Sequence, residues 1–263
     1  MKPAVMQLGR YGDILNILPL LFYLNERGQR NTLFVAREFE SVKNHITYAD
    51  VEVFPGPFED YHGGCTFAKA RQLNPLLKAS VYGKNFIYKR ETPNFCQEAY
   101  HRCSPEYGRM FANHEFDKIR LDTTPHGHEG MILAKYLPKR EKPIVLMNFN
   151  TISSPLPDAN KWKSVINLEL GTDYTVLDLG EVRAPSLLDL VALYQRADLL
   201  ITADTGTLHL AGATDLPYIA FQNDLWESWF MGYTRGNCIL KVKYSQQGIA
   251  RNQVIHAARK ALE

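Results

Sequence analysis

The stretch Ala197–Gln222, ADLLITADTGTLHLAGATDLPYIAFQ, decides the fold of this 263-residue chain. Its apolar run over Leu199 to Ala203 predicts a strand, and the residues from Thr205 to Thr214 predict a helix. A second apolar run, Tyr218 to Phe221, predicts another strand. Strands that alternate with helices are typical of a parallel sheet covered by helices. The sequence therefore predicts an α/β fold.

The junction between this strand and helix has the residues of an anion site. Asp204 can cap the helix, and Thr205, Gly206 and Thr207 then place backbone N–H groups in its first turn. A well-capped helix without a ligand is the alternative interpretation, because Asp and Thr are common caps. His209 follows one turn later, and on its own it is more often a structural histidine than a catalyst.

A second strand–loop–helix unit opens the chain. Ala4 to Leu8 predicts a strand, Gly9-Arg10-Tyr11-Gly12-Asp13 forms a glycine-bearing loop, and apolar spacing predicts a helix over 14–24. The loop lacks the GxGxxG pattern of dinucleotide-binding proteins. Asp13 is either a helix cap or a carboxylate that faces a ligand, and the spacing leaves both open. Pro19 predicts a kink or a limit to the first turns, and Gly28 predicts the helix end.

The rest of the chain continues the alternation, with a less regular middle. The segment Pro138–Pro143 is polar and flanked by prolines, so we expect lobes over 1–140 and 141–263. Further strands are predicted over 32–36, 51–54, 85–88, 144–149, 174–179 and 239–242, and helices over 38–45, 94–113, 131–136, 161–170, 187–194 and 247–262.

Composition excludes several classes of protein. Apolar residues make up 45% and charged residues 22%, which is typical of a globular protein and not of a disordered or collagen-like chain. No apolar run is long enough for a transmembrane helix, and the N-terminus lacks the order of a signal peptide. Four irregularly spaced cysteines indicate a reduced, cytoplasmic protein, with peripheral contact to the inner membrane left open. We expect no metal site, because His126 and His128 have no ligand partners at suitable spacing.

Four segments together resemble the heptosyltransferase-like glycosyltransferases, glycosyltransferase family nine. They are LGRYGDILNILPLLFYL near the N-terminus, then NKWKSVINLEL, SLLDLVALYQRADLLI and the Ala197–Gln222 stretch, in the family's order. The resemblance implies a GT-B fold, with two Rossmann-like lobes facing each other across a cleft. It also implies inverting transfer of a sugar, heptose by analogy, without an obligatory metal or other cofactor. The co-substrate would be a nucleotide-diphosphate sugar, with an ADP-sugar favoured, and the acceptor a glycan or glycolipid.

The resemblance also assigns residues. Asp13 matches the catalytic base, Thr205, Gly206 and Thr207 match the diphosphate-binding turn, and Asp204 matches a donor-contacting aspartate. Lys161 matches a phosphate-contacting lysine, with Lys163 as the alternate. Glu181 matches a residue that contacts the ribose of the donor. The remaining expected contacts are His209 for the donor and Gly9, Arg10 and Gly12 for substrate.

Other functions stay open. Residues 69–90 carry six basic and no acidic residues among aromatic ones, which suits a phosphorylated glycan, an anionic membrane or nucleic acid. One alternative is therefore sugar transfer onto hydroxymethylated bases of phage DNA. Alternatives of another class are a nucleotide-sugar epimerase and a non-catalytic nucleotide-sugar binding protein. The sequence does not fix the oligomeric state.

Overall fold

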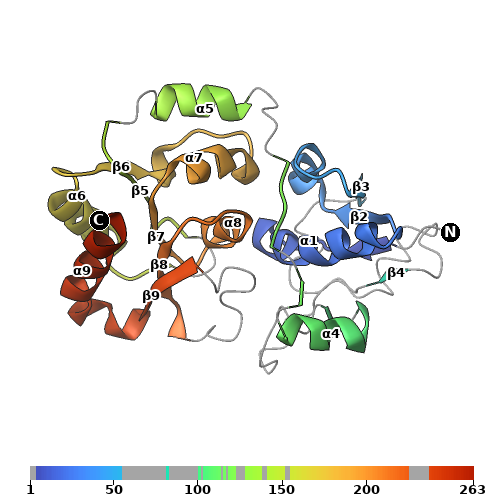
Figure 1. Cartoon of the computed structure of the whole chain (residues 1–263). Helices are drawn as coiled ribbons and strands as arrows, with labels where there is room; N and C mark the ends of the chain where they lie inside the picture. The colour runs from blue at the N-terminus through green and yellow to red at the C-terminus, as the bar shows by residue number, and fades with distance from the viewer. Residues whose placement is uncertain are drawn as a thin grey trace. The chain divides into compact units, whose positions relative to one another are not determined.

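The computed structural model of the chain forms two compact units, Met1–Asp122 and Thr123–Glu263, each with its own parallel sheet (Figure 1). The structure describes residues 4–54, 81–82, 100–101, 103–113, 115–116, 118–122, 128–137, 141–151, 155–224 and 237–263. Two α/β units confirm the predicted fold class.

In the first unit, four parallel strands are ordered β3-β2-β1-β4. The strands are β1 (Ala4–Met6), β2 (Asn31–Val35), β3 (Ala49–Val53) and β4 (Val81–Tyr82). Helix α1 (Tyr11–Glu26) follows β1 directly, and η1 (Arg37–Asn44) and α4 (Pro105–Ala112) complete the described elements. Because the order runs outward from β1 in both directions, the loop after β1 lies at the switch point where open α/β sheets bind ligands.

Helix α1 confirms the helix predicted over 14–24 and is longer at both ends. Its residues 14–21 are all buried, so the helix is embedded in its unit. It continues through Pro19, where the sequence predicted a kink or a limit, because the buried apolar side chains on both sides of the proline hold the helix in place. Gly28 has a φ of +74° and ends the helix as expected.

In the second unit, five parallel strands are ordered β6-β5-β7-β8-β9. They are β5 (Ile144–Asn148), β6 (Thr175–Asp178), β7 (Leu199–Ala203), β8 (Tyr218–Gln222) and β9 (Cys238–Lys243). The helices are α5 (His128–Tyr136), α6 (Ala159–Leu170), η3 (Leu179–Glu181), η4 (Leu187–Leu190), α7 (Val191–Arg196), α8 (Gly206–Leu210), η5 (Ala211–Ala213), η8 (Tyr244–Ile249) and α9 (Arg251–Leu262).

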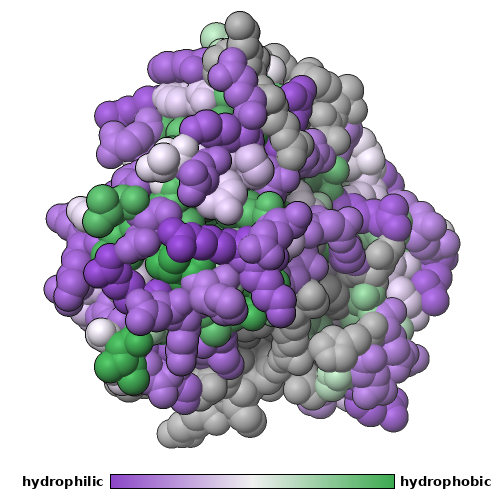
Figure 2. Space-filling model, turned by 60° about the vertical axis from the view of Figure 1, so that its left-hand side comes forward, coloured by the Kyte–Doolittle hydropathy of each residue, from purple (hydrophilic) through white to green (hydrophobic). Residues whose placement is uncertain are grey.

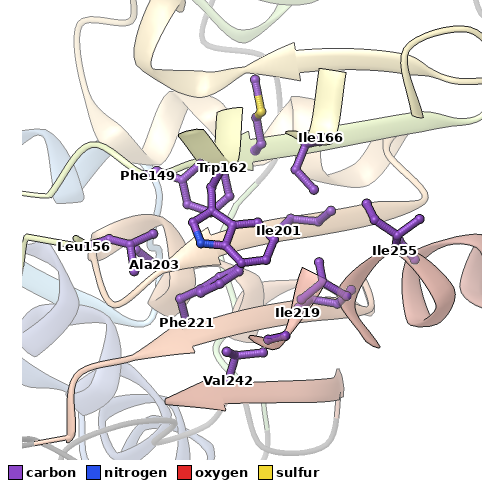
Figure 3. Packing of buried hydrophobic residues seen from close by; sticks show 14 of the residues in the cluster. Phe149, Leu156, Trp162, Ile166, Ile201, Ala203, Ile219, Phe221, Val242 and Ile255 are labelled. Carbon is purple, nitrogen blue, oxygen red and sulfur yellow. The ribbon is translucent and has the colours of Figure 1, made fainter. Parts of the chain in front are cut away.

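Helices cover both faces of this sheet. Helices α6 and α9 pack on one face, where Trp162 lies against Phe221 with ring centroids 4.6 Å apart (Figure 3). Every residue of β5, β7 and β8 is buried, as expected for a parallel sheet between two helical layers. Sequence periodicity was sufficient to predict these elements because their apolar runs are short and continuous.

Helix α5 belongs to the second unit, since it packs on α7 and η4. The compact units thus divide at 122/123, whereas the sequence placed the boundary at 140. A polar, proline-flanked segment marks a loop, but packing decides which unit a preceding helix joins. The helix predicted over 205–214 forms as the short α-helix α8, which is followed directly by the 3-10 helix η5. The strand predicted over 85–88 lies outside the described residues.

No helix in the described part of the chain is long and apolar enough to cross a membrane. Figure 2 shows a face that is mostly hydrophilic with small separate hydrophobic spots. The large apolar side chains that are exposed, such as Leu168 and Ile249, come from different elements. Isolated exposed apolar residues of this kind are ordinary on a globular surface.

Candidate functional site

The candidate site of the second unit lies at the carboxyl ends of β5 and β7. These two strands are neighbours, and the chain order runs outward from them to β6 on one side and to β8 and β9 on the other. This is the switch point at which open parallel sheets bind their ligands. Asn148 ends β5, and Ala203 ends β7 and leads into the turn that begins at Asp204.

Thr207 anchors that turn from within. Its Oγ1 accepts a hydrogen bond from Asn148 Nδ2 at 3.0 Å and lies 3.0 Å from Thr202 Oγ1. Its backbone carbonyl accepts from the hydroxyl of Tyr194 at 2.8 Å. All four residues are buried. The Thr207 hydroxyl is therefore bonded inside the protein, so its place in the site is to fix the backbone of the turn.

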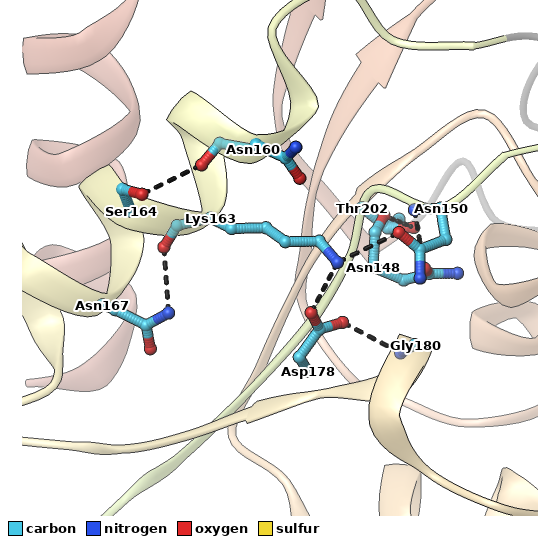
Figure 4. A network of polar contacts seen from close by, with 9 residues as sticks. All are labelled: Asn148, Asn150, Asn160, Lys163, Ser164, Asn167, Asp178, Gly180 and Thr202. Carbon is cyan, nitrogen blue, oxygen red and sulfur yellow. Dashed lines mark hydrogen bonds and ion pairs between the residues drawn. The ribbon is translucent and has the colours of Figure 1, made fainter.

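A second set of polar contacts continues from Asn148 across the sheet edge (Figure 4). Asn148 Oδ1 accepts from the backbone N–H of Asn150 at 3.0 Å, and Asn150 Oδ1 accepts from Lys163 Nζ at 3.0 Å. The same ammonium group lies 2.7 Å from Asp178 Oδ2, and Asp178 Oδ1 accepts from the N–H of Gly180 at 2.9 Å. Side chains from β5, α6 and β6 are thereby held in one connected network.

Glycine is required at position 180 for this packing. A Cβ there would collide with Asn150 Nδ2 and would lie 3.1 Å from Asp178 Oδ1. The bare backbone lets the Asn150 amide approach and still reach Lys163. The loop after β6 is thus shaped to fit the network, and it presents Glu181, an exposed residue, directly afterwards.

The predicted donor residues fall into three groups. Thr205, Gly206 and Thr207 form the turn, with Thr205 rather than Asp204 as the N-cap of α8. Asp204 and His209 are partly exposed beside it. Lys161 is exposed on the first turn of α6, whereas the alternate Lys163 is inside the network.

Burial sets the charge of the two titratable groups near the turn. It raises the pKa of Asp204 to about 7, because the surrounding protein removes water from the carboxylate and so disfavours the charged form. It lowers the pKa of His209 to about 4, so the imidazole is neutral at physiological pH.

The predicted residues of the first unit gather at the end of β1. Asp13 Oδ2 accepts a hydrogen bond from the backbone N–H of Arg10 at 2.9 Å, which caps the start of α1. A Cβ on Gly9 would collide with this carboxylate, so glycine lets it fold back over the loop. Gly12 accepts from Asn16 Nδ2 at 2.9 Å. Asp13 stays partly exposed, so the cap and a second role are compatible.

Two sequence features fall outside this description. Of the basic stretch 69–90, only residues 81 and 82 lie in the described part of the chain, and His126 is likewise outside it. Conversely, sequence reasoning missed Asn148, Asn150, Asp178 and Thr202. The signal was present for two of them, because Asn148 and Asp178 are polar residues that end apolar strands, where parallel sheets place their ligand-binding groups.

Comparison with known proteins gives structural matches alone. No family model and no curated protein sequence matches the chain. The glycosyl transferase family 9 structure from Veillonella parvula superposes with a TM-score of 0.72 at 14% identity, covering 99% of this chain and 97% of that one.

Two E. coli structures are also similar. The ADP-heptose lps heptosyltransferase II has a TM-score of 0.66 at 12% identity, covering 100% of this chain and 98% of that one. Heptosyltransferase WaaC with ADP has a TM-score of 0.60 at 15% identity, covering 99% and 100%. The resemblance read from the four sequence segments thus extends over the whole chain at the level of structure, and the fold is the GT-B fold of those glycosyltransferases.

Proposed function

We propose that the protein is a glycosyltransferase that moves a sugar from a nucleotide-diphosphate sugar to a hydroxyl acceptor. The observation that carries the proposal is the buried Asn148–Thr202–Thr207 bond set, which fixes the 204–207 turn at the switch point of the second sheet. A rigid turn suits a diphosphate, because preorganised N–H donors need no reordering when the anion binds. The GT-B fold supports the same interpretation.

The donor we propose carries adenosine diphosphate. Two similar structures are described as an ADP-heptose enzyme and as an enzyme with ADP, and both share the fold of this chain. Thr205, Gly206 and Thr207 would hold the diphosphate through their backbone, with Asp204 and His209 beside it. Glu181 follows β6 and would contact the ribose. Lys161 is free to reach a phosphate from the first turn of α6, since it is exposed.

The reaction we propose is a single inverting displacement without an obligatory metal. The acceptor oxygen bonds to the anomeric carbon, the bond from that carbon to the phosphate oxygen breaks, and the nucleoside diphosphate leaves. Asp13 would take the acceptor proton, and Gly9, Arg10 and Gly12 would form the surrounding acceptor loop.

The acceptor we propose is a glycan or glycolipid, as in the family that the sequence resembles. Transfer to DNA depended on the basic stretch 69–90, which is almost entirely outside the described residues, so no structural observation favours it. The proposed enzyme acts in the cytoplasm or at the inner face of the membrane that holds such acceptors.

The test is a reaction with ADP-heptose followed by mass spectrometry, with and without a lipopolysaccharide-core acceptor. The proposal predicts acceptor-dependent release of ADP, a product heavier by one heptose and unchanged rates in EDTA. Conversion of the sugar without any acceptor would identify an epimerase instead. Binding of ADP-heptose without either reaction, in the wild type and in Asp13→Asn alike, would identify a binding protein.

A further inference from the structure

The two faces of the second sheet differ in polarity at their carboxyl ends. Ile201 and Phe221 belong to the apolar cluster under α6 and α9. Because side chains alternate along a strand, Thr202 and Gln222 point to the opposite face, as Asn148 does. That face therefore carries one polar side chain near the end of each of the three adjacent strands β5, β7 and β8.

Gln222 differs from the other two in its hydrogen bonding. The Thr202 hydroxyl donates a hydrogen bond to the backbone carbonyl of Asn148, and the side chains of both residues are bonded to the Thr207 hydroxyl. Gln222 is completely buried, yet within the described ranges neither its Oε1 nor its Nε2 has a hydrogen-bond partner. Burying an amide without a partner destabilises a fold, so such a residue calls for an explanation.

The position of Gln222 suggests what its partner is. The register pairs Ala203 with Phe221, so Gln222 lies level with Asp204, one strand along from the turn. The proposed ribose contact, Glu181, follows β6 on the other side of that turn. A nucleotide sugar is elongated, with its diphosphate in the middle. If the diphosphate lies at the turn and the nucleoside points toward β6, the sugar points toward β8.

We propose that Gln222 is a specificity-determining residue that reads the sugar of the donor through hydrogen bonds to its hydroxyl groups. The inference rests on the proposed function. A primary amide has two N–H donors and an oxygen that accepts twice, and a sugar diol offers the same combination of donors and acceptors. Gln222 is the last residue of its strand and has three rotatable side-chain bonds, so it can turn toward the carboxyl edge when the sugar binds.

The test compares Gln222→Met, which keeps the side-chain length and removes the amide, with Gln247→Met as the matched control. Gln247 Oε1 accepts from Trp162 Nε1 at 3.1 Å, so its amide has a structural partner. The measurements are the Tm of the unliganded protein and the Kd values for ADP and ADP-heptose by calorimetry. We expect Gln222→Met to raise Tm by about 2–4 °C, since an unsatisfied amide is removed. We expect Gln247→Met to lower it.

Gln222→Met should also weaken the binding of ADP-heptose about tenfold and leave the Kd for ADP within about twofold of the wild-type value. A lower Tm for Gln222→Met would overturn the inference, because the amide would then have a structural partner. If Gln222→Met changes the Kd values for ADP and ADP-heptose equally, or changes neither, the inference about Gln222 is overturned. The proposed function would still be supported as long as the wild-type protein binds ADP. Wild-type protein that binds neither compound would overturn the proposed function, and this inference with it.

Discussion

Lys163 and Asp178 form an ion pair, 2.7 Å from Nζ to Oδ2, in which the side chains are only 18% and 13% exposed. The lysine also donates to Asn150, so its charge is used within the protein. It therefore holds the edge between β5 and β6 in place, and its ammonium group is already paired. This relationship distinguishes the two lysines that sequence alone left as alternates, because Lys161 is the exposed one.

The pair should be measurably coupled. We expect Lys163→Met and Asp178→Asn each to lower the free energy of unfolding by about 1–3 kcal/mol, because each leaves a mostly buried partner unsatisfied. The double variant should lose less than the sum of the two. Urea unfolding of all four proteins checks this. The exposed pair Arg30–Asp50, with side chains 43% and 36% exposed, is the control and should show a coupling below about 1 kcal/mol. Equal coupling in the two pairs would show that burial does not strengthen the interaction between Lys163 and Asp178.

Glycine at position 180 should be necessary for the network. Gly180→Ala places a Cβ against the Asn150 amide, which must move away from Lys163. We expect a loss of about 1–2 kcal/mol in unfolding free energy, the size of one or two hydrogen bonds. Gly130→Ala is the control, since nothing lies within 4 Å of its Cβ and the residue is in helix α5. There alanine should stabilise by up to about 1 kcal/mol. If Gly180→Ala left the free energy of unfolding unchanged, the contact with Asn150 would be dispensable for stability.

Asp13 has a capping role that mutation can separate from the catalytic role that we propose. Asn at this position keeps an oxygen for the Arg10 N–H but accepts no proton, whereas Ala removes both functions. We expect Asp13→Asn to retain the wild-type Tm and to lower kcat about 10²–10⁴-fold, the usual range for a general base. Asp13→Ala should lower both kcat and Tm. Normal turnover by Asp13→Asn would exclude the base role and leave the cap as the sole function.

The shifted pKa values of Asp204 and His209, beside the turn, predict opposing pH dependences of stability. The pKa of Asp204 is raised to about 7, so the folded protein binds more protons than the unfolded chain between about pH 4 and 7, and stability falls as pH rises. The pKa of His209 is lowered to about 4, so the unfolded chain binds more protons between about pH 4 and 6.5, and stability rises with pH. The two slopes oppose each other in the wild type.

Replacing one of the two residues should reveal the pH dependence of stability that is due to the other. Between pH 4.5 and 6.5, Tm should rise with pH in Asp204→Asn and fall with pH in His209→Gln, relative to the wild type. The double variant should return to the wild-type slope. Calorimetric scans at half-unit pH steps measure this, and parallel curves for all four proteins would show that neither pKa is shifted.

Much of the fold was predictable because its signals are local. The strands β5, β7 and β8 are continuous apolar runs. Ser186 and Asp189 form a capping box at the start of η4, with the three-residue spacing that is typical of this motif. The resemblance in four segments added the arrangement into two lobes of the GT-B type.

The interior of the site was less predictable because it depends on contacts between distant residues. Thr207 and Asn148 are 59 positions apart, and only the strand order β5-β7 brings them within 3.0 Å. Sequence spacing alone could not show that the Thr207 hydroxyl is hydrogen-bonded inside the protein. The assignment of Lys161 over Lys163 followed the resemblance, and only the location of Asp178 gives it a physical reason.

If the 204–207 turn binds the diphosphate of a nucleotide sugar, such ligands should stabilise the folded protein. The measurement is a thermal-shift comparison of ADP, GDP, UDP, dTDP, CDP, their sugar conjugates and NAD, with Lys161→Ala and Gly206→Val alongside the wild type. A ligand at 100 times its Kd adds about 2.7 kcal/mol. We expect a clear rise in Tm with ADP and ADP-heptose that is reduced in both variants. No rise with any nucleoside diphosphate, or a rise with NAD alone, would contradict it.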